Sequence, residues 1–251
     1  MTPWITKPVP FNIGQGAAAG AADDCTYRSG TVFSDWSFTG DYAVSSGQLQ
    51  ANIDTGYSNN GSSGFYDLTT DDVSETSWIL RWKWNLESVT QVGGSPAVIG
   101  VGLYSASASA GDDSAVGGSW DPTQQVAVIF ASAESGQRYF QTCTGKASTN
   151  FYGTTTRSNI VQDQSFSASY YMQIKRYDDE GTDTLAYSYT TNSDYTTDAV
   201  TVEVTDTDYM PSSLRFLKIE SWQHGGGTGQ SGIDSTVETF TFNNDTDEAC
   251  S

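Results

Sequence analysis

Apolar and polar side chains alternate along the second half of residues 77–86, SWILRWKWNL. One parity is wholly apolar: Trp78, Leu80, Trp82, Trp84 and Leu86. Arg81, Lys83 and Asn85 lie at the other parity. Because successive side chains of a strand point to opposite faces, this pattern predicts a β-strand with one face against a core and one face in water. The three tryptophans are therefore expected to pack in the core.

Seven further segments have the composition of strands, and clusters of Gly, Asn, Asp, Ser and Pro separate them. They span residues 97–104, 125–131, 170–177, 184–190, 199–204, 214–222 and 235–244. Segments 97–104 and 125–131 are apolar at both parities, which predicts central strands. The turn DDEGTD joins 170–177 to 184–190 and predicts a hairpin. Strands do not alternate with helices, so the sequence predicts an all-β fold, an antiparallel jelly-roll β-sandwich, over residues 25–251.

The charge of the chain argues against polyanionic partners. Acidic residues number 30 and basic residues 11, which gives a formal net charge of −19, and the basic residues form no cluster in the sequence. Nucleic acid and anionic membrane surfaces are therefore not expected as partners. No run reaches the roughly 18 apolar residues of a membrane span, so no membrane insertion is expected either.

Residues 1–24 are predicted to form an extended N-terminal arm. Pro3, Pro8 and Pro10 keep this segment extended and remove backbone donors, so it is a poor central strand. Its apolar side chains are expected to contact another subunit of an assembly. These residues are Trp4, Ile5, Val9, Phe11 and Ile13. The alternative is that the arm folds back over its own sandwich. The segment lacks the basic start and the continuous apolar core of a secretory signal.

The three cysteines, Cys25, Cys143 and Cys250, do not have the spacing of a metal site. Cys25 and Cys250 flank the β-rich region, so a disulfide between them is predicted if the two ends of that region meet. The alternative is that the cysteines are buried free thiols. An odd count leaves at least one cysteine free or paired with another molecule.

Three stretches give the chain a recognisable pattern: an aromatic-rich opening (32–53), a long strand after an acidic turn (73–90) and a Gly-rich loop before the last strand (215–244). With these stretches the chain resembles the concanavalin A-like lectin/glucanase superfamily, in its laminin G-like branch, over residues 26–247. The resemblance implies two curved sheets, neighbouring termini, and a concave face or rim loops that bind glycans. Such domains recur in surface and virion proteins of marine microbes and their viruses.

Loop aromatics are the predicted ligand-binding residues. Trp120 lies in the turn GGSWDP, and Trp222 stands directly before the Gly-rich loop that holds His224, the single histidine of the chain. Aromatic faces pack well on sugar rings, and loops display them. The alternative is that each tryptophan caps the core and that His224 is a loop residue with no special role.

Calcium is the cofactor that the sequence raises, and no other is predicted. Asp112, Asp113 and Asp121 enclose a Gly-rich loop, and calcium takes six to eight oxygen ligands, often from such loops. The alternative is a solvated acidic loop. The pattern of an EF-hand is absent from the sequence.

Catalytic residues are not predicted. The glucanase branch of the superfamily carries a Glu-x-Asp-x-x-Glu strand, whereas Glu203, Asp206 and Asp208 in EVTDTD have a different spacing. Alternation along a strand points Glu203 and Asp206 to opposite faces, and retaining hydrolysis needs two carboxyl groups about 5–5.5 Å apart. The chain also lacks a Gly-x-Ser-x-Gly motif.

The predicted function is that of a non-enzymatic structural protein of a virion or an extracellular surface. Capsid decoration protein, fibre and receptor-binding protein all fit this description, with other subunits of the assembly as partners and glycans as candidate ligands. The alternative is a secreted glycan-active enzyme, either a glucanase or a polysaccharide lyase.

Overall fold

The fold was analysed in a computed structural model of the chain. The described residues are 27–28, 33, 35–40, 42–46, 48–55, 63–68, 73–90, 97–107, 124–134, 137–145, 156–162, 168–205, 207–223 and 231–246. They form strands, turns and irregular segments and contain no helix. Consequently, no helix in this part of the chain is long and apolar enough to cross a membrane.

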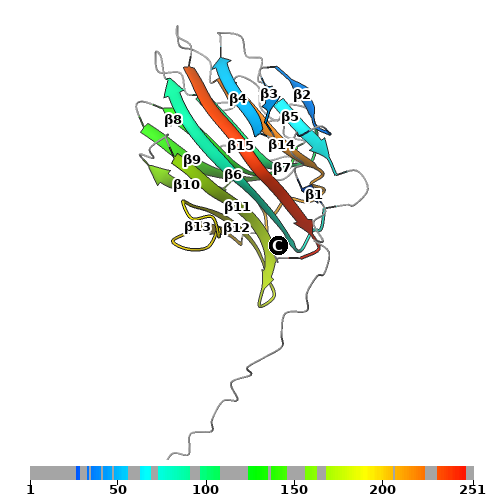
Figure 1. Ribbon diagram of the computed structural model, residues 1–251. Coiled ribbons are helices and arrows are strands. Elements are labelled where there is room, and N and C mark those ends of the chain that lie inside the picture. Colours follow the sequence, from blue (N-terminus) through cyan, green and yellow to red (C-terminus); the bar gives the residue numbers. More distant parts are fainter. Residues whose placement is uncertain are drawn as a thin grey trace, which may run out of the picture.

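Two antiparallel sheets form the molecule, and Figure 1 shows their strands lying in two layers. The eight-stranded sheet has the order β13-β12-β11-β6-β15-β4-β3, and β1 pairs with β15 beside this path. Its strands are β1 (Tyr27–Arg28), β3 (Tyr42–Ser45), β4 (Gln48–Thr55), β6 (Trp78–Thr90), β11 (Ala168–Asp179), β12 (Thr182–Thr190), β13 (Val200–Val204) and β15 (Ser231–Asn244).

The seven-stranded sheet has the order β10-β9-β8-β7-β14-β5-β2. Its strands are β2 (Ser37–Thr39), β5 (Ser63–Asp67), β7 (Ala97–Tyr104), β8 (Val126–Glu134), β9 (Gln137–Gly145), β10 (Thr156–Gln162) and β14 (Phe216–Gln223). Each sheet thus contains strands from both halves of the chain. The all-β class and the antiparallel jelly-roll sandwich are confirmed.

Each of the eight predicted strands corresponds to an observed strand. The predicted hairpin is also present, because β11 and β12 pair with Asp179 opposite Thr182. Glu180 (φ 52°) and Gly181 (φ 90°) form its two-residue turn. Positive φ at both central residues matches the twist of the flanking strands, which explains the glycine in DDEGTD.

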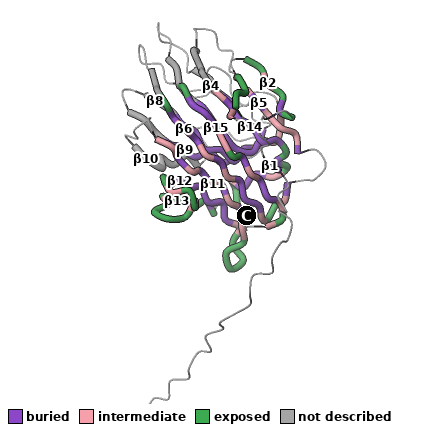
Figure 2. Tube along the Cα trace, in the orientation of Figure 1, coloured by how far each residue is buried: buried purple, intermediate pink, exposed green. Residues whose placement is uncertain are grey.

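The core lies between the sheets and is rich in aromatic side chains. Trp78, Trp82 and Trp84 are completely buried, as the alternation in β6 predicts. Trp82 stacks on Phe240 of β15 with a ring-centroid distance of 5.8 Å, and Trp84 contacts Phe140 of the opposite sheet at 6.1 Å. Figure 2 shows burial along the strands and exposure at the β11–β12 turn.

The first and last strands are neighbours, as the resemblance implied. Tyr27 of β1 lies opposite Phe242 of β15. Cys25 and Cys250 lie outside the described residues, so their disulfide stays a prediction, whereas Cys143 is buried and forms no disulfide. The arm, residues 1–24, also lies outside the described residues. Its predicted contacts through Trp4, Ile5, Val9, Phe11 and Ile13 therefore stay predictions as well.

Candidate functional site

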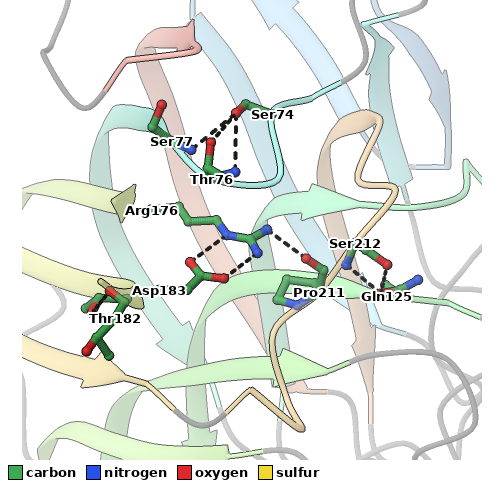
Figure 3. Close-up of polar contacts among 10 residues, drawn as sticks. Ser74, Thr76, Ser77, Gln125, Arg176, Thr182, Asp183, Pro211 and Ser212 are labelled. Carbon is green, nitrogen blue, oxygen red and sulfur yellow. Dashed lines mark hydrogen bonds and ion pairs between the residues drawn. The ribbon is translucent and has the colours of Figure 1, made fainter. Parts of the chain in front are cut away.

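Polar contacts close one end of the sandwich. Arg176 continues the inward-facing series of β11 and is 5% exposed. Its Nε and Nη2 donate to the two carboxylate oxygens of Asp183 at 3.0 and 2.7 Å, and its Nη1 donates to the carbonyl of Pro211 at 2.8 Å. Nearby, the Gln125 side-chain oxygen accepts from the backbone of Ser212 at 2.6 Å (Figure 3). These three hydrogen bonds of Arg176 stay within the fold, which indicates a structural role for this end.

The centre of the outer face of the seven-stranded sheet is also buried. Apolar residues of this face form a second buried cluster: Tyr104, Val126, Val128, Phe130, Cys143 and Phe216. Beside them, Lys218 (0% exposed) and Glu220 (1% exposed) form an ion pair of 3.2 Å. Burial lowers the pKa of Lys218, and the charge of Glu220 opposes this effect. Burial likewise raises the pKa of Tyr104, over whose ring the Lys218 ammonium lies at 4.7 Å. The centre of this face is therefore buried, whereas Ser37 and Thr39 of the edge strand β2 are exposed on the same side.

The outer face of the eight-stranded sheet is partly exposed and polar. We define its polar face by the residues Gln48, Arg81, Lys83, Asn85, Ser169, Tyr171, Gln173, Thr236 and Glu238, which come from β4, β6, β11 and β15. Glu238 is central, because its Oε1 accepts from Gln48 and from Asn85, each at 2.6 Å. Its Oε2 accepts from the Lys83 ammonium at 3.1 Å. The side chains of Lys83 and Glu238 are 25% and 19% exposed.

Asn85 extends this network to both neighbouring strands. Its amide nitrogen also donates to the Thr236 hydroxyl at 2.9 Å, and its amide oxygen accepts from the Ser169 hydroxyl at 2.5 Å. The network thus joins side chains of four adjacent strands. Because their partners already fix these side chains, the polar face is held rigid before any ligand arrives.

The loop between β12 and β13, residues 191–199, lies across the same face. Tyr195 reaches over β11 and β6 to β15: its ring meets the Tyr171 ring edge-on at 5.3 Å, and its hydroxyl shares a hydrogen bond with Thr239. The Arg81 guanidinium lies 4.7 Å from the Tyr195 ring centroid. Tyr195 has a φ of 63°, which side chains rarely adopt, so these contacts hold the loop in a strained conformation.

Asp194 stabilises the turn that presents Tyr195. Its Oδ1 accepts from the backbone of Thr196 and of Thr197, each at 2.9 Å. Hydrogen bonds from the Thr197 side chain, and then from the backbone of Thr197 and Thr196, lower the pKa of Asp194 to about 2. The carboxylate therefore stays charged at neutral pH and keeps these bonds.

Several polar groups of the face remain available to a ligand. Arg81 donates from Nε to Gln173 Oε1 at 2.8 Å, and its two Nη groups donate to no described residue. The Tyr171 hydroxyl and the Gln173 amide nitrogen likewise have no hydrogen-bond partner in the described part of the chain. Burial lowers the pKa of Arg81, yet guanidinium stays protonated in proteins. The face can thus donate hydrogen bonds and offer aromatic ring surface.

Most of the residues predicted as a ligand site lie outside the described residues. This holds for Trp120, His224 and the predicted calcium ligands Asp112, Asp113 and Asp121. The backbone of Trp222 belongs to β14 and pairs with Val98, but the side chain is outside the description. These residues stay predictions for ligand and calcium binding.

Acidic side chains, the commonest catalytic and metal-binding groups of this chain, do not gather into a metal site in the described residues. There, no cluster of three or more His, Cys, Asp or Glu residues has the geometry of a metal site. Glu203 lies exposed on the edge strand β13 and accepts a hydrogen bond from the Tyr177 hydroxyl at 3.1 Å. Asp206, its predicted neighbour, lies outside the description.

The polar face was not among the sequence-based candidates. The alternation in β6 assigns Arg81, Lys83 and Asn85 to a water-facing side, but it does not say what lies beside them. In the chain, Glu238 is 155 residues away from Lys83 and 190 residues away from Gln48. Only the strand order brings them together.

Comparisons with known proteins support the fold. No protein-family model and no curated protein sequence matches the chain. Among solved structures, the legume lectin-like domain from Entamoeba histolytica has a TM-score of 0.53 at 14% identity, over 84% of this chain and 90% of that one. The carbohydrate recognition domain of Emp47p has a TM-score of 0.55 at 11% identity, over 84% and 89%.

A phage protein module is similar to the same extent. The CBM2 module of the evolved Dit of Lactobacillus casei BL23 phage J-1 has a TM-score of 0.55 at 12% identity, over 88% of this chain and 95% of that one. At such low identity these likenesses show the fold alone, and the laminin G-like branch stays a prediction. With its two antiparallel sheets and these structural neighbours, the chain has the concanavalin A-like lectin fold.

Proposed function

We propose that this protein is a non-enzymatic glycan-binding protein and that its sugar lies on the polar face of the eight-stranded sheet. One observation carries the proposal. Around Arg81, Tyr171 and Gln173, the face combines unused hydrogen-bond donors with aromatic rings on a rigid base. Sugars present many hydroxyl groups and flat apolar ring faces, so they match a surface that offers both kinds of contact.

The structural neighbours support a binding role. The similar structures include a legume lectin-like domain and a carbohydrate recognition domain. Among the described acids of this face, Glu238 uses both carboxylate oxygens to hold Gln48, Asn85 and Lys83. A carboxylate engaged in this way supports the face and is poorly placed to transfer a proton to a glycosidic oxygen.

We further propose that the protein is a component of a virion or surface assembly. The presence of a similar fold in a module of a phage protein supports this proposal. The composition of residues 1–24 supports it too, because their apolar side chains and three prolines suit an extended segment that lies against another subunit.

Two tyrosines of one strand give a matched test of glycan binding. Tyr171 belongs to the polar face, whereas Tyr177 points to the same side of β11 six residues further on, about 20 Å away. On a glycan array, the Tyr171→Ala variant should lose at least about tenfold in affinity, as expected for a stacked and hydrogen-bonded ring. The Tyr177→Ala variant should bind like the unchanged protein.

Equal binding by both variants, or no binding of the unchanged protein to any glycan, contradicts the proposed function. Bound glycans should also be recovered intact after prolonged incubation. Sustained product release that disappears in a Glu203→Gln or His224→Ala variant contradicts the non-enzymatic assignment.

A further inference from the structure

The guanidinium of Arg81 has more hydrogen-bond donors than the fold uses. Guanidinium carries five N–H groups. Nε donates to Gln173, while the four N–H groups on the two Nη atoms find no acceptor among the described residues. The Tyr195 ring, 4.7 Å from Cζ, covers part of the group and restricts its orientation. Arg81 is thus a partly buried cation of fixed orientation, and its unused N–H groups can donate hydrogen bonds to an acceptor group of a ligand.

The groups next to Arg81 are donors as well. Lys83 follows two residues later on the same face of β6, and Tyr171 lies opposite Lys83 in β11. Gln173 lies opposite Arg81 and presents its amide nitrogen, because its oxygen is occupied by Arg81. These four side chains lie within about 7 Å of one another along and across two adjacent strands.

The carboxylates nearest to this group are already engaged. Glu238 binds Lys83, Asn85 and Gln48. Asp194 acts on Arg81 through its charge, but its oxygens accept hydrogen bonds from Thr196 and Thr197. Among the described residues, neither carboxylate accepts a hydrogen bond from the Nη groups of Arg81.

Positively charged side chains gather on this side of the sheet, although the chain as a whole is acidic. Acids outnumber bases by 30 to 11, yet Arg81, Lys83 and Lys175 project from the same side of β6 and β11. Glu238, Asp194 and Glu203 also lie on this side, and each already accepts a hydrogen bond, from Lys83, Thr197 and Tyr177 respectively. A local gathering of cations on such a protein gives an anionic ligand one preferred place to bind.

We propose that the polar face recognises an anionic saccharide, whose carboxylate or sulfate group accepts paired hydrogen bonds from the Nη groups of Arg81 while Lys83, Tyr171 and Gln173 contact the same sugar. This inference rests on the proposed glycan-binding function and narrows its substrate class. Arginine suits the role because its planar fork matches two oxygens of a carboxylate or sulfate, whereas lysine offers a single point charge.

Matched saccharide pairs test the inference. Oligogalacturonate and its methyl ester differ in a negative charge, and a sulfated galactan and its desulfated form differ in the same way. Calorimetric titration at fixed ionic strength should show that one acidic member of these pairs binds at least about tenfold more tightly than its neutral counterpart. The pair that shows the preference distinguishes carboxylate from sulfate recognition.

Variants then assign the preference to Arg81. Arg81→Met keeps the apolar stem and should abolish the acidic preference, whereas Arg81→Lys should retain only part of it. Arg215→Met removes the same charge from an exposed arginine that pairs with Asp67, far from the face in the strand order, and should leave the preference intact. Tyr171→Phe removes one hydroxyl and keeps the ring contact. It should lower the affinity for both the acidic and the neutral saccharide of a pair without unfolding the protein.

The possible results separate this inference from the proposed function. Equal binding of acidic and neutral members, with sensitivity to Tyr171→Ala, overturns the acidic preference and leaves glycan binding intact. An acidic preference that survives Arg81→Met in a folded protein overturns the role of Arg81. Absence of binding to any saccharide overturns both.

Discussion

At the scale of single residues, one exposed carboxylate supports the loop that borders the polar face. Asp194 accepts backbone hydrogen bonds from Thr196 and Thr197, and its pKa falls from the usual value of 3.8 to about 2. A carboxyl group whose pKa is lower in the folded state contributes stability above its unfolded pKa. That contribution is lost as the pH falls through the folded value.

The Asp194→Ala variant should therefore be less stable than the unchanged protein at neutral pH, and the difference should disappear between about pH 4 and pH 2. Denaturant unfolding of both proteins across this range measures it. The Tyr195 ring should also become more mobile in the variant, because the turn that presents it loses its acceptor. A stability difference that stays constant down to pH 2 contradicts this role of Asp194.

At the scale of the strand, β14 contains a buried ion pair whose burial its sequence does not predict. Lys218 and Glu220 lie two residues apart on one face of β14, and Gly100 and Gly102 of β7 lie opposite them. A Cβ atom at Gly100 would collide with the Phe130 ring, and one at Gly102 would collide with the backbone of Ala127. The two glycines thus allow the close packing that removes the pair from water.

Removal of one partner takes away the opposite charge that the other, buried partner faces at 3.2 Å. The Lys218→Met variant is expected to lose about 3–5 kcal/mol of unfolding free energy, as is usual when a buried pair is broken. The double variant Lys218→Met/Glu220→Leu should recover most of this loss, because two apolar side chains of similar size replace both charges. Denaturant unfolding measures both, and a double variant as unstable as the single one contradicts the assignment.

Strands whose side chains alternate could be predicted, and strands with buried polar residues could not. The alternation in β6 and the two-sided apolar patterns of β7 and β8 correspond to their observed burial. By contrast, β9 was not predicted, because Gln141, Thr142 and Thr144 are polar and nevertheless buried. Packing against the opposite sheet explains this burial, since the Thr144 hydroxyl shares a hydrogen bond of 2.6 Å with that of Tyr187 in β12.

The polar face depends on register, which the sequence does not display. The pairing of β15 with β6 shifts between Asp234 and Ser235 and again between Glu238 and Thr241. Each irregularity changes which residues share a face, since the side-chain period of a strand is two. Glu238 therefore reaches Lys83 and Asn85 through a geometry that periodicity alone cannot reveal. The acidic turns and loop aromatics, in contrast, are visible in the sequence, and for this reason the sequence predicts the ligand and calcium sites in the loops.

At the scale of the whole molecule, the sandwich is expected to fold without its arm. The first described strand, β1, begins at Tyr27, after the arm ends, and already pairs with the last strand. Deletion of residues 1–24 should leave thermal unfolding nearly unchanged but abolish entry into the assembly, as followed by light scattering coupled to gel filtration. If the truncated protein unfolds while the intact protein is a stable monomer, the arm belongs to the sandwich core and the assembly proposal loses its main support.

The central claim is that a sugar binds on the polar face of the eight-stranded sheet. Backbone amide NMR shifts, recorded while the tightest-binding saccharide of the array is titrated, test it most directly. We expect the largest shift changes at residues 81–85 and 171–173 and in the loop 191–199, which contains Tyr195. Changes confined to residues 105–125 and 222–232, with the polar face unaffected, would contradict the claim and place the ligand instead at Trp120, Trp222 and His224.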